Sequence, residues 1–128
     1  MAFIENKHSS GKSRVFLTAS STTIAKGDAL VFSSGYLTPA TASDTTACPI
    51  VIAEEAVETG AWAHKEIKGL LVDPTMEFIV DCDDDTAQSQ VGTSVKFKDK
   101  ATADNGTTGG NIKVIAVMAG KKALVKFY

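Results

Sequence analysis

The segment IAKGDALVFSSGYLTPAT, residues 24–41, decides the fold class that this sequence predicts. Two glycine-containing turns, at 26–28 and 33–35, flank a short apolar run, and a second strand then leads to Pro39. Gly35 can take the positive φ that a tight hairpin turn requires. Pro39 has no N–H to donate to a ladder and therefore closes the second strand. The segment is predicted to form a β-hairpin.

The rest of the chain is also a series of short apolar stretches separated by turn residues. The tracts 41–46 and 101–110 are small and polar, so we expect them to be surface loops. Residues 54–57 are expected to form a strand and turn, because Gly60 leaves no room for a longer helix. Further strands are expected at 14–18, 49–52, 61–67, 70–72 (after an interruption at Gly69), 76–80, 91–97, 111–117 and 122–127.

These features predict an all-β fold, either a small β-barrel or a compact β-sandwich with an extended N-terminal arm. No linker divides residues 14–128, which are expected to form a single β domain, and no repeat of fixed period is visible. With 128 residues, the chain is long enough to bury a core without a metal ion or a disulfide.

Residues 1–13 are predicted to form a flexible arm, because they are mostly polar and end in SSGKS. The arm carries a small apolar hook, Phe3-Ile4. Three basic residues follow this hook: Lys7, Lys12 and Arg14. Two interpretations are open, a disordered terminus or an arm that lies across a neighbouring subunit by strand addition.

The composition favours a globular protein and argues against several classes of partner. Hydrophobic residues make up 44% of the chain and charged residues 22%, which is not the balance of a disordered protein. A net charge of −2 argues against nucleic-acid binding. No signal peptide is visible, and no apolar run approaches the ~20 residues of a membrane helix. We therefore expect synthesis in the cytoplasm and no membrane partner.

The side chains that could take part in catalysis or metal binding do not combine into a recognisable catalytic or metal site. The Gly11-Lys12-Ser13 sequence is not a phosphate-binding loop, since Asn6 stands where that motif requires glycine. The acidic turn 81–85 resembles the start of a calcium loop, but Gly92 occupies the position of the bidentate glutamate. An adventitious cation site there stays open. We therefore expect no enzymatic activity, no cofactor and no resident metal.

The two cysteines, Cys48 and Cys82, lack the paired spacing of a metal site. We interpret them as reduced thiols in a cytoplasmic protein, and a disulfide is possible only if the fold brings them together. The two histidines, His8 and His64, are too isolated in the sequence to suggest a catalytic triad or a metal site.

The order of these motifs resembles that of the small decoration, or cement, proteins of tailed-phage capsids. The resemblance lies in GDALVFSSGYLTPAT (27–41), in VIAEEAVETGAW (51–62) and in IKGLLV (67–72). It implies a barrel-like protein that binds the outside of an icosahedral shell, commonly as a homotrimer that clamps adjacent major capsid subunits. The implied location is the virion surface, after synthesis in the bacterial host. The resemblance carries over no catalytic or ligand-binding residue.

On this interpretation, contacts with the shell or between subunits are expected at the two chain ends and at the one tryptophan, which is expected to anchor either the core or an interface. The apolar C-terminal pair Phe127-Tyr128 is expected either to contact a neighbour or to close the barrel. The candidate residues are Phe3, Ile4, Lys7, Lys12, Arg14, Trp62, Phe127 and Tyr128.

Two alternatives to the shell protein stay open. One is a tail or baseplate module, or a receptor-binding module that presents Trp62 and Tyr36 to a carbohydrate. An exposed aromatic pair with coordinating carboxylates would favour the carbohydrate module, whereas buried aromatics would favour the shell protein. The other is a small β-barrel enzyme, which would need a concave polar pocket.

Overall fold

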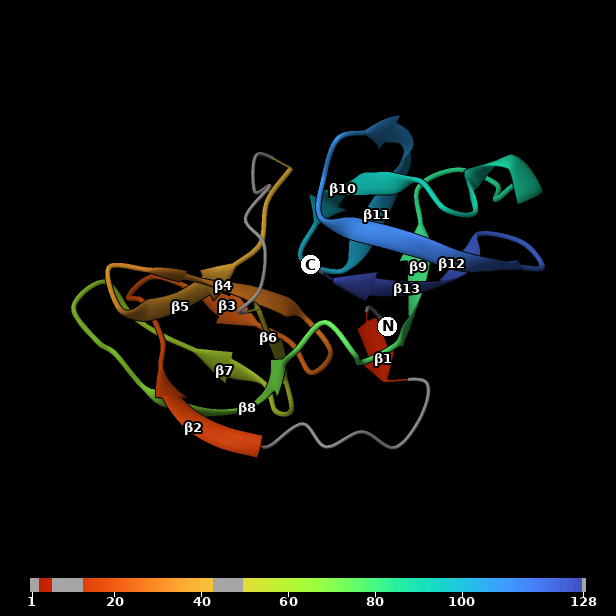
Figure 1. The fold of residues 1–128 in the computed structure, drawn as a ribbon. Coiled ribbons are helices and arrows are strands. Elements are labelled where there is room, and N and C mark those ends of the chain that lie inside the picture. The colour runs from red at the N-terminus through yellow and green to blue at the C-terminus, as the bar shows by residue number, and fades with distance from the viewer. Residues whose placement is uncertain (1–2, 6–12, 43–49, 128) are drawn as a thin grey trace.

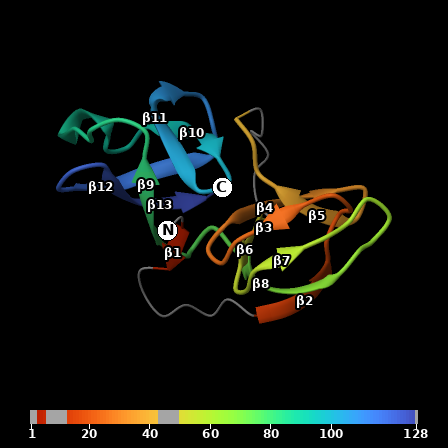
Figure 2. The ribbon, with the colours of Figure 1, turned by 180° about the vertical axis from the view of Figure 1, so that it is seen from behind.

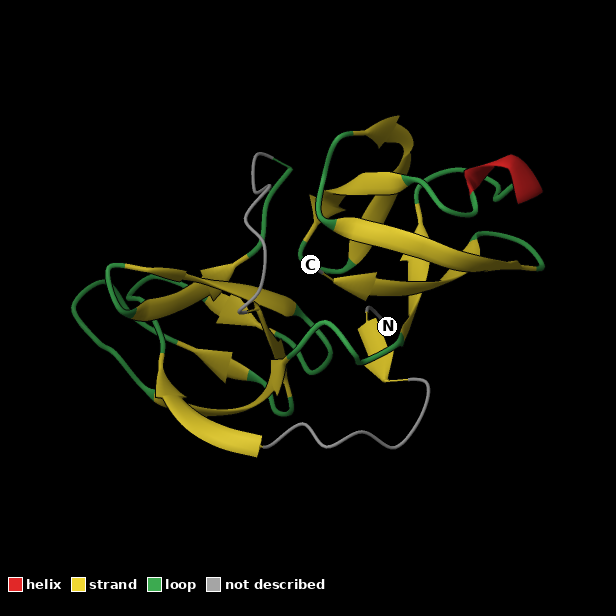
Figure 3. Ribbon diagram, viewed as in Figure 1, coloured by secondary structure: helices red, strands yellow, loops and turns green. Residues whose placement is uncertain are grey.

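The computed structural model describes residues 13–42 and 50–127, together with the backbone of residues 3–5. Across these residues the chain is built from short strands and one three-residue 3-10 helix, so the predicted all-β fold is confirmed (Figure 3). Two groups of strands lie side by side, with the strands of residues 13–72 in one and those of residues 3–5 and 78–127 in the other (Figures 1 and 2). The elements are β1 (Phe3–Glu5), β2 (Ser13–Leu17), β3 (Thr23–Ile24), β4 (Ala29–Ser33), β5 (Tyr36–Pro39), β6 (Ile50–Ala53), β7 (Val57–Glu58), β8 (Glu66–Val72), β9 (Phe78–Cys82), η1 (Gln88–Gln90), β10 (Ser94–Asp99), β11 (Thr102–Thr108), β12 (Ile112–Met118) and β13 (Lys122–Phe127).

The first group, here the N-terminal barrel, has the strand order β2-β8-β6-β4-β5. A parallel bridge between Thr18 and Leu37 brings the end of β2 against β5. The hairpin predicted over 24–41 is confirmed as β4 and β5, and the turn between them places Ser34 and Gly35 at φ values of 51° and 85°. A small two-stranded sheet, β3 with β7, lies outside this order.

The second group, here the C-terminal barrel, has the order β9-β11-β10-β12-β13, and β13 pairs again with β9 to close the ring. The strand β1 adds to the edge of β9, antiparallel. Three residues of the predicted arm are thus paired within their own chain.

The two barrels have the same topology. In each barrel the first strand pairs antiparallel with the fifth, the fifth with the fourth, the fourth with the second and the second with the third. In each, the third strand returns parallel to the first. A parallel pairing within an otherwise antiparallel barrel is a specific feature, so its recurrence indicates a structural repeat.

Individual backbone hydrogen bonds recur at equivalent positions of the two barrels. Gly27 N donates to Ala53 O as Gly92 N does to Val114 O, both at 2.8 Å. These two glycines also share a positive φ, of 91° and 89°. Four further matched pairs are Thr18 N–Lys65 O with Cys82 N–Lys121 O, Ala19 N–Leu37 O with Asp83 N–Ala103 O, Ala53 N–Asp28 O with Val114 N–Thr93 O, and Ala40 N–Ala29 O with Gly109 N–Ser94 O. The chain is therefore a tandem pair of one barrel.

The two barrels share one hydrophobic cluster. Residues of the N-terminal barrel such as Ala29 and Ile52 belong to the same buried cluster as Phe78, Phe97 and Phe127 of the C-terminal barrel. A second, smaller cluster fills the N-terminal barrel alone. The predicted domain of 14–128 thus consists of two barrels joined by a continuous apolar interface.

Three local predictions were wrong, because contacts distant in the sequence decide these segments. The expected loop at 101–110 is largely a strand, β11, because buried Asn105 bonds to the neighbouring acidic turn. The expected strand at 61–67 begins only at Glu66. Gly69 lies within β8 and does not interrupt it, because it allows Val51 to pack against the backbone. Most of the expected loop at 41–46 lies outside the described residues.

Candidate functional site

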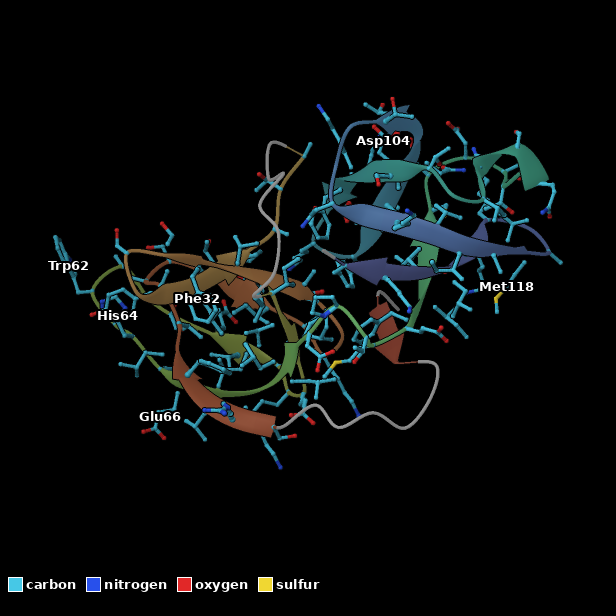
Figure 4. The ribbon with its side chains drawn as sticks, viewed as in Figure 1. Phe32, Trp62, His64, Glu66, Asp104 and Met118 are labelled. Carbon is cyan, nitrogen blue, oxygen red and sulfur yellow. The ribbon has the colours of Figure 1, made fainter. Side chains whose placement is uncertain are left out.

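The connection 54–65 distinguishes the N-terminal barrel from its repeat. In the C-terminal barrel the fourth and fifth strands are joined by a tight turn at 119–121. The equivalent connection in the N-terminal barrel is longer and contains β7. Trp62 lies at its tip with 98% of its surface exposed (Figure 4). An elaborated loop on a rigid scaffold is a common place for binding residues, so we take 54–65, the Trp62 loop, as the candidate site.

Thr59 anchors the first side of the Trp62 loop. Its hydroxyl is buried, accepts a hydrogen bond from Thr22 N at 3.0 Å and donates to Ala19 O at 2.9 Å. The adjacent Gly60 carbonyl accepts from Ser21 N at 2.9 Å. The backbone immediately before the tip is therefore fixed to the neighbouring turn.

His64 anchors the second side. Its Nδ1 lies 2.8 Å from Thr18 O, and because a carbonyl can only accept, Nδ1 must carry the proton. The imidazole also stacks on Tyr36, with ring centroids 4.0 Å apart and planes 10° apart. Thr18 N donates to Lys65 O at 2.9 Å, which ties the loop to β2. Only 61–63 extend beyond these anchors.

This arrangement presents an indole from a preorganised tip. Tryptophan buries a large area on binding, and little ordering entropy is lost when its backbone is already fixed. Other exposed apolar side chains lie on the same barrel: Val15 (63%), Leu17 (47%) and Phe32 (41%). Met118, on the C-terminal barrel, is 38% exposed. The site is suited to bind a surface.

The structure separates the predicted contact residues. Arg14 lies exposed on β2, and Trp62 lies at the loop tip. The backbone of Phe3 and Ile4 forms β1, whereas Lys7, Lys12 and Tyr128 lie outside the described residues. Trp62 is therefore an exposed surface residue and not a core anchor.

Of the two roles expected for Phe127, the structure shows that it closes the barrel as a core residue; as a candidate surface contact it requires a correction. It is fully buried, and its ring packs against those of Phe78 and Phe97 at centroid distances of 5.5 and 6.1 Å. The alternation of β13 turns Ala123, Val125 and Phe127 inward. Sequence reasoning also missed the stack of Tyr36 on His64, for which the local sequence gives no signal.

The acidic turn is held by Asn105 and forms no metal site that the described residues reveal. Asn105 Oδ1 accepts from Asp84 N at 3.0 Å, and its Nδ2 donates to the carbonyls of Asp84 and Asp85. Within 13–42 and 50–127, no group of three or more His, Cys, Asp or Glu side chains could hold a metal ion. Over the same residues, no helix is long and apolar enough to cross a membrane.

Cys82 is a buried free thiol, whereas Cys48 lies outside the described residues. Burial, together with the nearby charge of Asp81, raises the pKa of Cys82 to about 11. This thiol is thus protonated at neutral pH, which is typical of a structural cysteine.

Comparisons with protein-family models, with curated proteins and with solved structures gave no match to this chain. The functional argument therefore depends on the residues and their geometry.

Proposed function

We propose that this chain is a non-enzymatic structural protein of a bacteriophage virion. It binds the outer surface of the icosahedral capsid and clamps adjacent major capsid subunits as a homotrimer. The observation that carries the proposal is the 98% exposure of Trp62 on a loop fixed at Thr59 and His64. The order of motifs that resembles capsid decoration proteins supplies the identity of the partner.

A fully exposed indole is more consistent with a residue that binds a partner than with one that only supports the fold. Tryptophan is among the residues that dominate the binding free energy of protein interfaces. A clamp also needs little affinity at each contact, because several copies of one contact act together through avidity. Two rigid barrels that share a core supply the stiffness such a clamp requires.

The alternative is a tail or baseplate module, or one that binds carbohydrate. The exposed indole of Trp62 would suit stacking on a sugar ring. However, the ring of Tyr36 is stacked against His64 and only partly exposed. The structure matches neither expectation in full: Trp62 is exposed, whereas the shell protein was expected to bury its aromatic residues, and Tyr36 does not complete an exposed aromatic pair. The carbohydrate platform thus lacks one of its two expected residues, and the order of motifs supports a protein partner.

The test is co-sedimentation of the purified protein with empty, expanded heads that lack it. We expect saturable binding at a fixed ratio to the major capsid subunit. Trp62→Ala should weaken binding by roughly 30-fold, the loss of an interface residue worth about 2 kcal/mol. Met118→Ala removes an exposed apolar side chain from the other barrel and serves as the matched control. Recovery of the protein with tails, and not with heads, would contradict the proposal.

Trp62 also gives a direct spectroscopic measure, since it is the one tryptophan in the chain. Its fluorescence should be quenched by acrylamide as readily as that of free tryptophan in the unbound protein. Addition of heads should shift the emission to shorter wavelength and protect it from quenching. Binding without any change in this fluorescence would show that another surface makes the contact.

A further inference from the structure

In the C-terminal barrel, one edge of the first strand is shared by two partners. β9 pairs with β11 at Asp81 and Cys82, and with β1 at Phe78–Val80. The register of β1 is antiparallel, with Phe3 opposite Val80, Ile4 opposite Ile79 and Glu5 opposite Phe78. β1 comes from outside the barrel order, so this edge accepts an added strand.

The N-terminal barrel has the equivalent edge without the added strand. Thr18 occupies the position of Cys82, because the backbone N–H of each donates to the carbonyl of the lysine just before the fifth strand, at 2.9 and 2.8 Å. Counting back from Thr18, residues 14–16 of β2 match residues 78–80 of β9. Apart from the bridge of Thr18 to Leu37, no strand in the described part of the chain pairs with this edge of β2. Val15 at its centre is 63% exposed.

We propose that the edge of β2 receives the β1 segment of a second copy of this chain. In the register that β1 adopts on β9, Phe3 would face Phe16, Ile4 would face Val15 and Glu5 would face Arg14. An acidic residue would thus lie directly opposite a basic one, a favourable cross-strand pair.

The register of β1 on β9 places a different residue opposite Glu5. On β9, Glu5 lies opposite Phe78, which is apolar and fully buried. β2 offers an exposed arginine at the same position. If each copy gives one strand and receives one, a closed ring keeps the number of strand pairs and gains the Glu5–Arg14 pairs. The exchange covers the edge beside Val15, which is 63% exposed, and uncovers the edge of β9 at Phe78–Val80, so the net gain is the charge pair.

The test is self-association of the full chain, measured by analytical ultracentrifugation without any capsid. Arg14→Glu and Glu5→Arg should each raise the dissociation constant roughly three- to tenfold, because each places like charges opposite one another. The double variant should restore the wild-type value. Lys26→Glu makes the same charge change at an exposed turn of the same barrel and should leave association unchanged.

A second measurement identifies the strand. In a background with Cys48→Ala and Cys82→Ala, mixing Glu5→Cys chains with Arg14→Cys chains should give a disulfide-linked pair on mild oxidation. Mixing Glu5→Cys with Lys26→Cys chains should not. A monomeric wild type, a double variant that stays weak, or a link formed only when one chain carries both cysteines would each overturn the proposal. The proposal shares the homotrimer of the proposed function, so a monomeric wild type would contradict both. A double variant that stays weak, or a missing link between chains, would overturn only the exchange of β1, and because no capsid is used none of these outcomes tests docking to the shell.

Discussion

Lys100 and Asp28 join the two barrels through an ion pair whose carboxylate is buried. Lys100 Nζ lies 3.1 Å from Asp28 Oδ2, and the aspartate side chain is only 3% exposed. The same carboxylate oxygen accepts from Ala25 N at 2.8 Å, and the ammonium also donates to Thr23 O at 2.8 Å. A backbone hydrogen bond joins the two barrels at the same place, since Ala29 N donates to Lys100 O. Because the Asp28 carboxylate is buried at this interface, its charge costs free energy unless the Lys100 ammonium compensates it.

The first prediction is that Lys100→Met lowers the free energy of unfolding by about 2–4 kcal/mol, because it leaves the Asp28 carboxylate buried without its cation. Asp28→Asn should cost less, since the amide oxygen can still accept from Ala25 N. The measurement is chemical denaturation of the two single variants and the double variant, whose non-additivity gives the coupling of the pair.

Lys98→Met is the matched control for this pair. Lys98 Nζ lies 3.3 Å from Asp83 Oδ2, but these side chains are 51% and 37% exposed. An exposed pair of this kind contributes at most about 1 kcal/mol. Equal losses for Lys98→Met and Lys100→Met would show that the contact between the barrels gains nothing from the burial of Asp28.

The second prediction concerns Gly69, where the strand β8 passes close to β6. A Cβ added at Gly69 would lie 2.3 Å from Val51 Cγ1, so Gly69→Ala should lower the free energy of unfolding by about 1–3 kcal/mol through overpacking. Gly60→Ala is the control, because a Cβ there meets nothing within 4 Å. Thermal melts of both variants check this, and a neutral Gly69→Ala would mean that Val51 can move away.

The sequence was informative where local chemistry decides the structure. The hairpin over 24–41 follows from its turns, and the closing hairpin of β12 and β13 follows from Gly120, which has a φ of 77°. The tandem repeat could not be seen, because it is conserved in strand order and backbone hydrogen bonds and not in side chains. For example, Asp28 and Thr93 occupy equivalent positions and share no charge or shape.

The candidate site, too, was predictable from the sequence only where local features decide it. The one tryptophan identified the loop, since a large aromatic residue is informative wherever it lies. Its exposure was not predictable, because 61–67 has the composition of a half-buried strand. The anchors Thr59 and His64 bond to residues about 40 positions away, and no local pattern reports such contacts.

The third prediction tests why 102–108 is a strand. Asn105 is 4% exposed, and its amide satisfies the backbone of Asp84 and Asp85. Asn105→Ala should lower the free energy of unfolding by about 2–3 kcal/mol, because it leaves buried backbone groups unpaired. Gln88→Ala, at an exposed position of the neighbouring turn, should have little effect. Chemical denaturation distinguishes the two.

Asn105→Asp adds a pH readout to this prediction. A carboxylate at this position cannot donate to the carbonyls and would stand among three neighbouring acidic residues, so its pKa should rise on folding. Its protonated form is then favoured by folding, and the variant should lose stability relative to wild type as the pH rises from 4 to 7. A stability difference that is independent of pH would contradict this role of the amide.

The fourth prediction concerns the reactivity of Cys82. Its pKa of about 11, against an ordinary value of 9.0, means that the thiolate at pH 8 is about 100-fold scarcer than for an unperturbed thiol. In a Cys48→Ala background, alkylation by iodoacetamide should be slower by at least this factor in the folded protein than in the same chain in denaturant. Burial is the larger cause of the shift and Asp81 the smaller, so Asp81→Asn should raise the rate only a few-fold. Because folding favours the neutral thiol, stability should also fall as the pH rises from about 9 toward 11, and Cys82→Ala should remove that part of the decline. Rapid alkylation of the folded protein at pH 8 would show that the strand β9 opens readily, and with it the edge on which β1 lies.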